Sequence, residues 1–537
     1  DDNNDPMEID GSIMQAPSLY GNNNRWLQGH LEYLRDTYNE EHDLDDSEFQ
    51  KKFVDIIPSN WTVCSLTMYP NTNELSIVRL QAETTPTIIK LSLQRTRRSH
   101  NNTSENTMDF VGAIDELKQI ISESDKTIST AKFYTEKTAV NEWWKRRMQL
   151  DHQLKRLLNT IETEWLGGFK GLLCGNYHED IEGLRKFQRK LNQLLHNFVY
   201  GLPPNSNREK SQKMIDINLN MCRVFLRLGP DPSNRELDDI IYFLLSCYES
   251  QGVDIDYNRA DIVQLKNQLK GEINRYHETA LIKNIDTMTR KQNDHVILIP
   301  DNHLHPIPWE SLPIMRSQPV SRLPCLSFLR DRIMRSLAAN DDDDNWTEVS
   351  INSKKTCYVL NPSGDLMHTQ NEFETAFKNM DGWQGLIQEK PVELQWQNML
   401  ESRDLYMYFG HSAGQSIIRG QNIKKLKHCP VAILMGCSSG TLVDKGEYDA
   451  DGYIINYLLG GSPAVVANLW DVTDKSIDQL TGKMFNTWGL LKNNNNNTNN
   501  NVSLVEAVSS SRDACTLPYL IGAAPIIYGI PVYIKRS

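Results

Sequence analysis

Two short apolar runs in the C-terminal half of the chain each stop at a reactive side chain. Residues 405–409 are followed by a Gly-His pair that ends at His411, and residues 431–435 by a Gly-Cys pair that ends at Cys437. Both runs have the length and composition of buried strands, and the stretch between them is long enough for the crossover that parallel strands require. We therefore predict two parallel neighbours in one sheet, with the imidazole and the thiol delivered to the same edge.

A thiol and an imidazole placed in this way predict a nucleophilic site. A free thiol has a pKa of about 8.5 and is mostly protonated at neutral pH, so it needs an imidazole as a base or as the cationic partner of a thiolate. We assign Cys437 as the nucleophile and His411 as its partner, with the backbone N–H groups of Ser412 and Cys437 as candidate oxyanion donors. Three flanking glycines are expected to turn the backbone sharply and expose such N–H groups: Gly410, Gly436 and Gly440.

Two features of this pattern leave alternatives. No acid stands at a spacing that identifies it as the group that orients His411, so we predict a dyad with an unassigned orienting group, for which a backbone carbonyl is one candidate. A lone cysteine at a strand end is also often a buried core thiol. Cys429 enters the same strand from the other end and is predicted to be such a structural thiol.

Residues 410–414 also match G-x-S-x-G, the serine nucleophile motif of α/β-hydrolases, and a predicted strand precedes them. That fold requires an acid and then a histidine after the serine. Only one histidine, His428, follows Ser412, and no Asp or Glu lies between them. The order of residues therefore argues against a serine hydrolase.

Several ordered segments resemble separase, a family of caspase-like cysteine proteases that cleave cohesin at anaphase. Around the two strands they are YFGH (408–411), ILMGCSSG (433–440), LLGGSPAVVANLWDVTDKSIDQL (458–480) and IGAAPIIYGIPVYI (521–534); upstream they are FVDIIPSNWTVCSL (53–66), EWLGGFKGLL (164–173) and IPWESLP (307–313). The resemblance covers roughly residues 50–537. One departure is Ser412, which stands where the family usually has glycine.

This resemblance implies a cysteine endopeptidase that cuts after arginine in Glu-x-x-Arg sequences of the kleisin subunit of cohesin, which triggers sister-chromatid separation. It implies securin as an inhibitor that occupies the cleft as a pseudosubstrate, no metal or organic cofactor, and a location in cytoplasm and nucleus, at the mitotic spindle and chromosomes. The implied fold is α/β, a caspase-like mostly parallel sheet flanked by helices, preceded by a helix-rich α+β domain that helps bind substrate.

Three carboxylates after a further predicted strand are candidates for gripping the substrate arginine: Asp471, Asp474 and Asp478. The same stretch also suits a helix start, because Thr473 and Asp474 are good N-cap residues. The resemblance favours Asp478, then Asp474, then Asp471. Three internal Glu-x-x-Arg segments, Glu32–Arg35, Glu182–Arg185 and Glu272–Arg275, lie on predicted helices and are interpreted as surface ion pairs. His303 and His305 are a weak metal signal, since no further ligands stand near them.

A chain of 537 residues is too long for one core and predicts two or three domains. We assign residues 1–50 to an N-terminal tail with a short helix over 26–38, and residues 51–290 to a small sheet with a long helical insertion, substrate-binding and pseudoprotease-like. Residues 291–537 form the catalytic α/β domain, in which 526–534 is predicted to be one strand that closes the sheet.

Composition limits the partners. The net charge of −12 argues against nucleic acid as the main partner and suits a basic peptide. The nine cysteines are scattered and never arranged as CxxC, which indicates neither a disulfide framework nor a zinc site and favours a reducing compartment. No apolar run has membrane-spanning length and no signal-peptide pattern is present, so we expect an intracellular protein without membrane contact. Separases are usually far larger, so we expect a C-terminal part of a longer protein.

Two alternatives stand beside the separase interpretation. Another caspase-like peptidase of the CHAT type would share the strands before His411 and Cys437 and the LWDV-like strand, but the motifs at 53–66 and 164–173 argue against it. A non-catalytic scaffold that only binds a peptide partner would explain Ser412 as the mark of a degraded site. The presence of both His411 and Cys437 argues against a scaffold.

Overall fold

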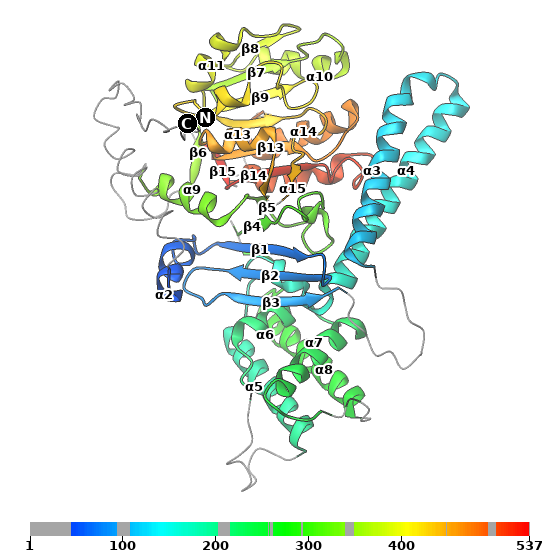
Figure 1. Cartoon of the computed structure of the whole chain (residues 1–537), viewed down its shortest axis with the longest axis vertical. Coiled ribbons are helices and arrows are strands. Elements are labelled where there is room, and N and C mark those ends of the chain that lie inside the picture. The colour runs from blue at the N-terminus through cyan, green and yellow to red at the C-terminus, as the bar shows by residue number, and fades with distance from the viewer. Residues whose placement is uncertain are drawn as a thin grey trace, which may run out of the picture.

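The computed structural model describes residues 44–93, 108–201, 215–255, 257, 261–291, 294–338, 348–446, 448–491 and 501–535. Within these ranges the chain forms one large sheet with helices packed around it (Figure 1). The described end of the predicted tail contains α2 (Asp46–Phe49). The helix predicted over 26–38, and with it Glu32–Arg35, lies outside the described residues.

Within the described residues, eleven strands form the large sheet, in an order that mixes early and late parts of the chain. From one edge to the other they are β3 (Thr87–Ser92), β2 (Glu74–Leu80), β1 (Trp61–Tyr69), β4 (His295–Pro300), β5 (Val320–Arg322), β14 (Pro525–Gly529), β13 (Ala464–Asn468), β10 (Val431–Leu434), β9 (Leu405–Phe409), β7 (Thr356–Leu360) and β8 (Gln384–Ile387). The pairs β1–β2, β2–β3 and β13–β14 are antiparallel, and the other neighbours are parallel. The predicted mostly parallel α/β sheet is confirmed.

The central strands are buried along their whole length because both faces of the sheet are covered. Every residue of β7, β9, β10 and β13 is buried, as expected for parallel strands between layers of helices. In the part of the chain that the structure describes, two smaller sheets accompany the large one: the hairpin β11 (Val443–Lys445) with β12 (Tyr448–Asp451), and β6 (Val349–Ile351) with β15 (Val532–Ile534).

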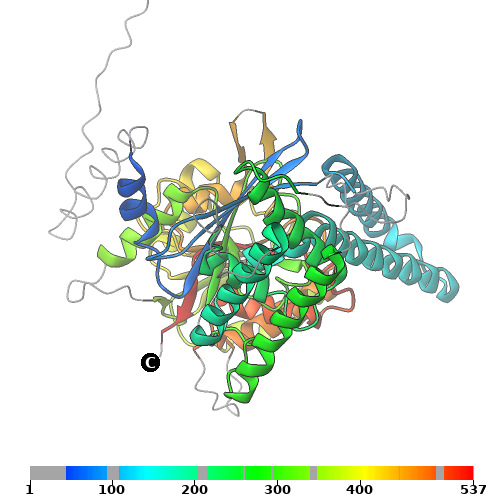
Figure 2. The same ribbon diagram turned by 90° about the horizontal axis from the view of Figure 1, so that it is seen from below.

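The helices fall into three groups (Figures 1 and 2). A long helical hairpin projects beside the sheet and consists of α3 (Phe110–Thr130) and α4 (Lys137–Thr160). A bundle of helices lies at the β3 edge and consists of α5 (Ile181–Tyr200), α6 (Leu219–Leu226), α7 (Asn234–Glu249) and α8 (Asp261–Ile282). The rest accompany the later strands: α9 (Leu326–Ala338), α10 (Met367–Lys378), α11 (Glu393–Glu401), α12 (Gly420–Ile423), α13 (Tyr453–Leu459), α14 (Asp474–Trp488) and α15 (Leu504–Ser511). None of the described helices is long and apolar enough to cross a bilayer.

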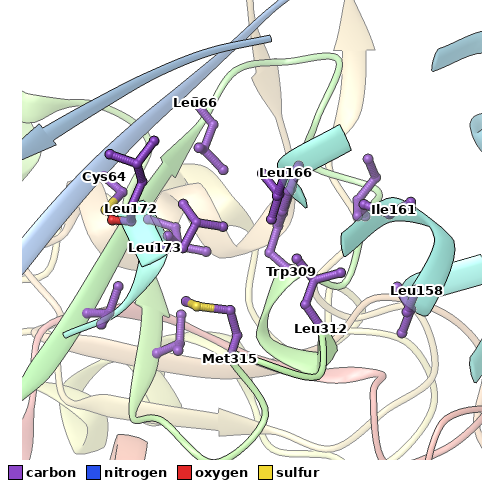
Figure 3. Close-up of a cluster of buried hydrophobic side chains, with 14 of the residues drawn as sticks. Cys64, Leu66, Leu158, Ile161, Leu166, Leu172, Leu173, Trp309, Leu312 and Met315 are labelled. Atoms are coloured by element: carbon purple, nitrogen blue, oxygen red, sulfur yellow. Dashed lines mark hydrogen bonds between the residues drawn. The ribbon is translucent and has the colours of Figure 1, made fainter. Parts of the chain in front are cut away.

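The sheet and its core run across the predicted boundary at residue 290. β1 pairs with β4 in parallel, so strands from both predicted domains are direct neighbours. Figure 3 shows Leu66 of β1 and Leu172 from the turns after α4 in one apolar cluster with Trp309 and Leu312. The two assigned segments are thus joined by continuous hydrogen bonding and a shared core.

The C-terminal strand differs from its prediction. Residues 526–534 were expected to form one strand at the closing edge, but they form β14, inside the large sheet, and β15, in a separate sheet with β6. The break has two local causes. Gly529 adopts φ +131°, a backbone conformation that favours glycine, and Pro531 has no N–H to continue a ladder.

Candidate active site

His411 and Cys437 follow two strands that are paired in parallel. Leu434 of β10 lies opposite Tyr408 of β9, and the N–H of Met435 donates to the Tyr408 carbonyl at 2.9 Å. The chain then leaves both strands at the same edge, so the loops that carry the imidazole and the thiol are neighbours. The predicted parallel pair is confirmed.

Gly436 holds these two loops together. A Cβ at this position would lie 1.8 Å from the carbonyl oxygen of Ser412 and 2.6 Å from that of Gly410. No side chain can be accommodated at such distances, because non-bonded carbon and oxygen atoms cannot approach so closely. The close packing of the two loops therefore requires glycine here.

A narrow pocket of about 30 Å³ connects the predicted site residues. It is lined by both His411 and Cys437, and by Asp474 and Asp478 from the first turns of α14. Leu366 and Thr369, which precede and begin α10, complete one wall together with Val472. The tertiary structure therefore brings the imidazole, the thiol and two carboxylates to a single pocket.

The Cys437 thiol is neutral in these surroundings. It donates a hydrogen bond to the Val472 carbonyl at 3.4 Å. Burial raises its pKa, and the nearby carboxylates of Asp471, Asp474 and Asp125 raise it further, because a thiolate is disfavoured by low dielectric and by negative neighbours. A thiol of this kind becomes a nucleophile only when a base removes its proton.

The imidazole of His411 has a carboxylate partner that the sequence analysis missed. Its Nε2 lies 2.8 Å from Oδ2 of Asp365, in the loop that follows β7. The hydrogen bond with His411 lowers the pKa of the Asp365 carboxyl, so the carboxylate form is favoured beside the ring. The two residues are 46 positions apart in the chain. No local sequence pattern marks Asp365; it reaches the site because β7 is the direct neighbour of β9 and its end therefore faces the same edge.

The left-handed residues of the site are serines and not the predicted glycines. Ser412 and Ser438, each directly after a predicted catalytic residue, have φ +52°. Positive φ is not observed at Gly410, Gly436 or Gly440. Within the described chain the backbone N–H groups of Ser412 and Cys437 donate to no protein acceptor. The serine that departs from the family pattern thus adopts a conformation that glycine adopts without strain.

The three candidate arginine-binding acids lie in two different places. Asp478 is almost fully buried and accepts hydrogen bonds from Thr369 Oγ1 at 2.9 Å and His368 Nδ1 at 3.2 Å. Burial raises the pKa of Asp478 to about 6. Asp474 shares the pocket, whereas Asp471 lies outside it and accepts a hydrogen bond from Ser438 Oγ at 2.6 Å.

Other signals from the sequence have structural roles. Thr473 is the N-cap residue of α14, but its side chain makes no capping hydrogen bond. Arg275 pairs with Glu272 at 2.5 Å, as expected, whereas Glu182 pairs with Lys283 and not with Arg185. Cys429 is buried, and burial raises its pKa to about 12. Among the described residues no group of three or more His, Cys, Asp and Glu side chains is placed to hold a metal ion.

Comparison with known proteins decides the family. The family model described as "Separin, protease domain" matches residues 70–477, which is more than half of the chain. The chain belongs to the separin family. This membership confirms the separase resemblance and decides against a CHAT-type enzyme.

Curated and solved separins agree with this. The chain is 36% identical over 499 residues to separin of Emericella nidulans and 37% identical over 490 residues to separin of Schizosaccharomyces pombe, in each case over 90% of this chain. It spans 23% and 25% of the length of these relatives. The crystal structure of the Saccharomyces cerevisiae separase–securin complex matches with a TM-score of 0.77 and 28% identity, over 90% of this chain and 31% of that chain. The fold is therefore that of a separin protease domain.

Proposed function

We propose that this chain is a cysteine endopeptidase that cleaves polypeptides after arginine, with Cys437 as nucleophile and His411 as base. The observation that carries the proposal is the single pocket lined by Cys437, His411 and Asp478. A nucleophile, a base and a buried acid that suits a guanidinium lie within reach of one substrate residue.

The reaction follows from the groups at the pocket. His411 takes the proton from the Cys437 thiol, and the sulfur attacks the carbonyl carbon of the scissile peptide. The N–H groups of Ser412 and Cys437 donate to the oxyanion that forms. The imidazolium then gives its proton to the leaving amine, which leaves a thioester on Cys437. His411 next deprotonates a water that hydrolyses the thioester and regenerates the thiol.

Asp365 supports the imidazole in this scheme. Its carboxylate accepts the hydrogen bond from Nε2, which leaves Nδ1 as the nitrogen that exchanges a proton with the thiol. A carboxylate beside the ring also stabilises the imidazolium that exists between the two proton transfers.

Arginine recognition rests first on Asp478 and second on Asp474. Asp478 is a buried carboxylate whose pKa is raised by burial, and a guanidinium beside it would offset that cost. A pocket of about 30 Å³ has room for one or two waters. The arginine side chain therefore enters only when lining side chains move, which makes the pocket an induced-fit site.

We extend two properties of relatives to this chain as part of the proposal. The solved yeast relatives are separase–securin complexes, and we propose that a securin occupies the cleft of this chain as a pseudosubstrate. We propose the kleisin subunit of cohesin as the substrate, cut at Glu-x-x-Arg, and activity in cytoplasm and nucleus at mitosis, on the resemblance described above.

The experiment is cleavage of a Glu-x-x-Arg peptide by the purified chain, followed by mass spectrometry. We expect a cut after arginine that is lost in Cys437→Ser and with an Arg→Asp peptide. Cys247→Ser, in α7 and far from the pocket in sequence and fold, is the thiol control and should keep full activity. A folded chain that binds the peptide and cuts nothing would favour the scaffold alternative.

A further inference from the structure

A second and larger cavity, of about 630 Å³, opens beside the catalytic loops. One wall is a face of α3, the helix of the projecting hairpin that lies nearer the sheet in Figure 1. The opposite wall is formed by the loop after Cys437, around Leu442, and by Leu469–Asp471 at the end of β13. His305 and Tyr528 also line it. We call this cavity the α3 groove.

The α3 groove and the arginine pocket are adjacent. Asp471 lines the groove and the next residue, Val472, lines the pocket. Asp471 also accepts the hydrogen bond from Ser438, the residue after Cys437. A peptide with its arginine in the pocket therefore carries a neighbouring residue past the mouth of the groove.

The walls of the α3 groove are apolar. Ile114 and Ile121 of α3 face Leu442 and Leu469 across it, and all four side chains are only partly covered by the rest of the chain. Partly covered aliphatic walls favour a long aliphatic stem, because contact with it removes further apolar surface from water.

The polar groups of the α3 groove include two carboxylates, Asp125 and Asp471, beside the exposed amines of Lys118 and Lys126. Oδ1 of Asp125 is buried and has no hydrogen-bond partner within the described chain. Burial and the nearby Asp471 carboxylate raise the pKa of Asp125 to about 6, although Arg147 of α4 lowers it in part. Two nearby carboxylates, one of which carries an unpartnered oxygen, form an environment that a cation stabilises.

His305 adds a further unpartnered group. It is 8% exposed, and its Nδ1 has no hydrogen-bond partner within the described residues. Burial and the charge of Arg322 lower the pKa of His305 to about 3, so the ring is neutral at pH 7. A neutral imidazole nitrogen can accept a hydrogen bond from an ammonium or guanidinium group. Nδ1 of His305 is thus a hydrogen-bond acceptor in addition to the carboxylates of Asp125 and Asp471.

Resting on the proposed endopeptidase function, we propose that the α3 groove is a second specificity subsite that binds a lysine or arginine side chain near, but distinct from, the arginine at the cleavage site. The stem lies between the aliphatic walls and the cation lies between Asp125 and Asp471. Two lysines stand on the groove face of α3, Lys118 and Lys126, both exposed, and Lys126 pairs with Glu123 at 2.9 Å. The net charge of −12 also favours a basic partner.

The test is a lysine scan of the substrate peptide. The glutamate and arginine of Glu-x-x-Arg are fixed, and lysine replaces alanine in turn at the two positions between them and at each of the three positions after the arginine. We expect lysine at one position to raise kcat/KM about tenfold, the size expected of one charge-assisted hydrogen bond. Asp125→Asn should abolish that preference, measured as the ratio of kcat/KM for the lysine peptide to kcat/KM for the alanine peptide. The ratio is the readout because Asp125 also raises the pKa of Cys437, so its removal can change cleavage of both peptides alike.

Two control variants separate the groove from general effects. Asp115→Asn removes the same charge from an exposed position of α3 that does not line the groove, and should keep the lysine preference. Ile121→Ser replaces an aliphatic side chain of the groove wall with a small polar one and should reduce the lysine preference. It tests the subsite even if Asp125→Asn folds poorly. The absence of a lysine preference at every position, or a preference that survives both Asp125→Asn and Ile121→Ser, would overturn the proposal. A preference for glutamate would also overturn the proposal, because it would indicate that Lys118 and Lys126 bind an acidic side chain in the groove.

A binding measurement distinguishes failure of this subsite from failure of the proposed endopeptidase function. Fluorescence anisotropy with Cys437→Ser measures the Kd of the alanine and lysine peptides without turnover. If nothing is cut but the lysine peptide binds about tenfold more tightly, and Asp125→Asn removes the difference, the subsite stands and the endopeptidase proposal fails. If peptides are cut but lysine changes neither the rate nor the affinity, the subsite proposal fails and the endopeptidase proposal stands.

Discussion

The Nε2 atom of His411 lies 2.8 Å from Oδ2 of Asp365, which stands on the loop after the neighbouring strand. Both side chains are 57% exposed, so the pair is open to solvent in the free chain. The sequence analysis left the group that orients His411 unassigned, and this contact makes the Asp365 carboxylate the candidate for it. In the proposed mechanism Asp365 is a positioning residue, because it contacts the imidazole and not the substrate.

Asp365→Ala is expected to lower kcat at least about tenfold, with little change in KM, because the imidazole loses its fixed orientation and its counter-charge. Asp365→Asn keeps an acceptor oxygen and should lose less. Steady-state kinetics on the arginine peptide measures both. Asp381→Asn, which removes an exposed carboxylate paired with Lys354, is the matched control. An unchanged kcat in Asp365→Ala would refute the positioning role.

The pKa of Asp478 predicts how arginine cleavage depends on pH. The value is raised to about 6 in the free chain, so the carboxyl loses its charge as the pH falls through 6. We expect kcat/KM for an arginine peptide to fall below that pH, since a neutral carboxyl grips a guanidinium weakly. A citrulline peptide, which is neutral, should lack this acid limb. Identical pH profiles for the two peptides would contradict the assignment.

Asp478 also makes a prediction about stability. Because its pKa is higher in the folded than in the unfolded chain, the native state is favoured by this group below the unfolded pKa, and that advantage is lost as pH rises from about 4 to 6. Asp478→Asn keeps an acceptor for Thr369 and removes the buried charge. It should raise the free energy of unfolding at pH 7.5 by up to about 3 kcal/mol and have no effect near pH 3. Denaturant unfolding at both pH values measures this.

Gly436→Ala should prevent assembly of the site. The added Cβ would overlap the Ser412 carbonyl oxygen at 1.8 Å, so the loops after β9 and β10 must separate. We expect loss of cleavage and a lower unfolding temperature. Gly482→Ala is the control: it lies inside α14 with no atom within 4 Å of the new Cβ, and should be neutral or stabilising by about 0.5–1 kcal/mol. Wild-type activity in Gly436→Ala would show that the loops tolerate separation.

Ser412→Gly should keep activity and raise the free energy of unfolding by up to about 1 kcal/mol, because glycine adopts φ +52° without strain while the backbone N–H remains. Ser438→Gly has the same φ and is expected to behave alike in stability, although it also removes the hydroxyl that donates to Asp471. Denaturant unfolding and peptide cleavage measure the two effects. Loss of activity in Ser412→Gly would mean that the hydroxyl, and not the N–H, matters at this position.

The local features of this protein were determined by sequence alone. The apolar run at 405–409 coincides with β9, and the run at 431–435 exceeds β10 by one residue. Two apolar runs that end at His411 and Cys437 were sufficient to predict a parallel pair and its reactive edge, because parallel strands alternate with crossovers and side chains at their ends share an edge. The family motifs added the expectation of cleavage after arginine and favoured Asp478 as the acid that binds it.

Only the tertiary structure decided which distant groups meet these side chains. Asp365 reaches His411 because β7 lies beside β9, and strand order is not encoded in any local pattern. The same applies to Asp125 of α3, which lies near Asp471 across the α3 groove. The separation of Asp471 from Asp474 and Asp478 depends on how the chain turns between β13 and α14. Long-range packing sets such contacts, since each depends on the burial of apolar surface summed over the whole sheet and its helices.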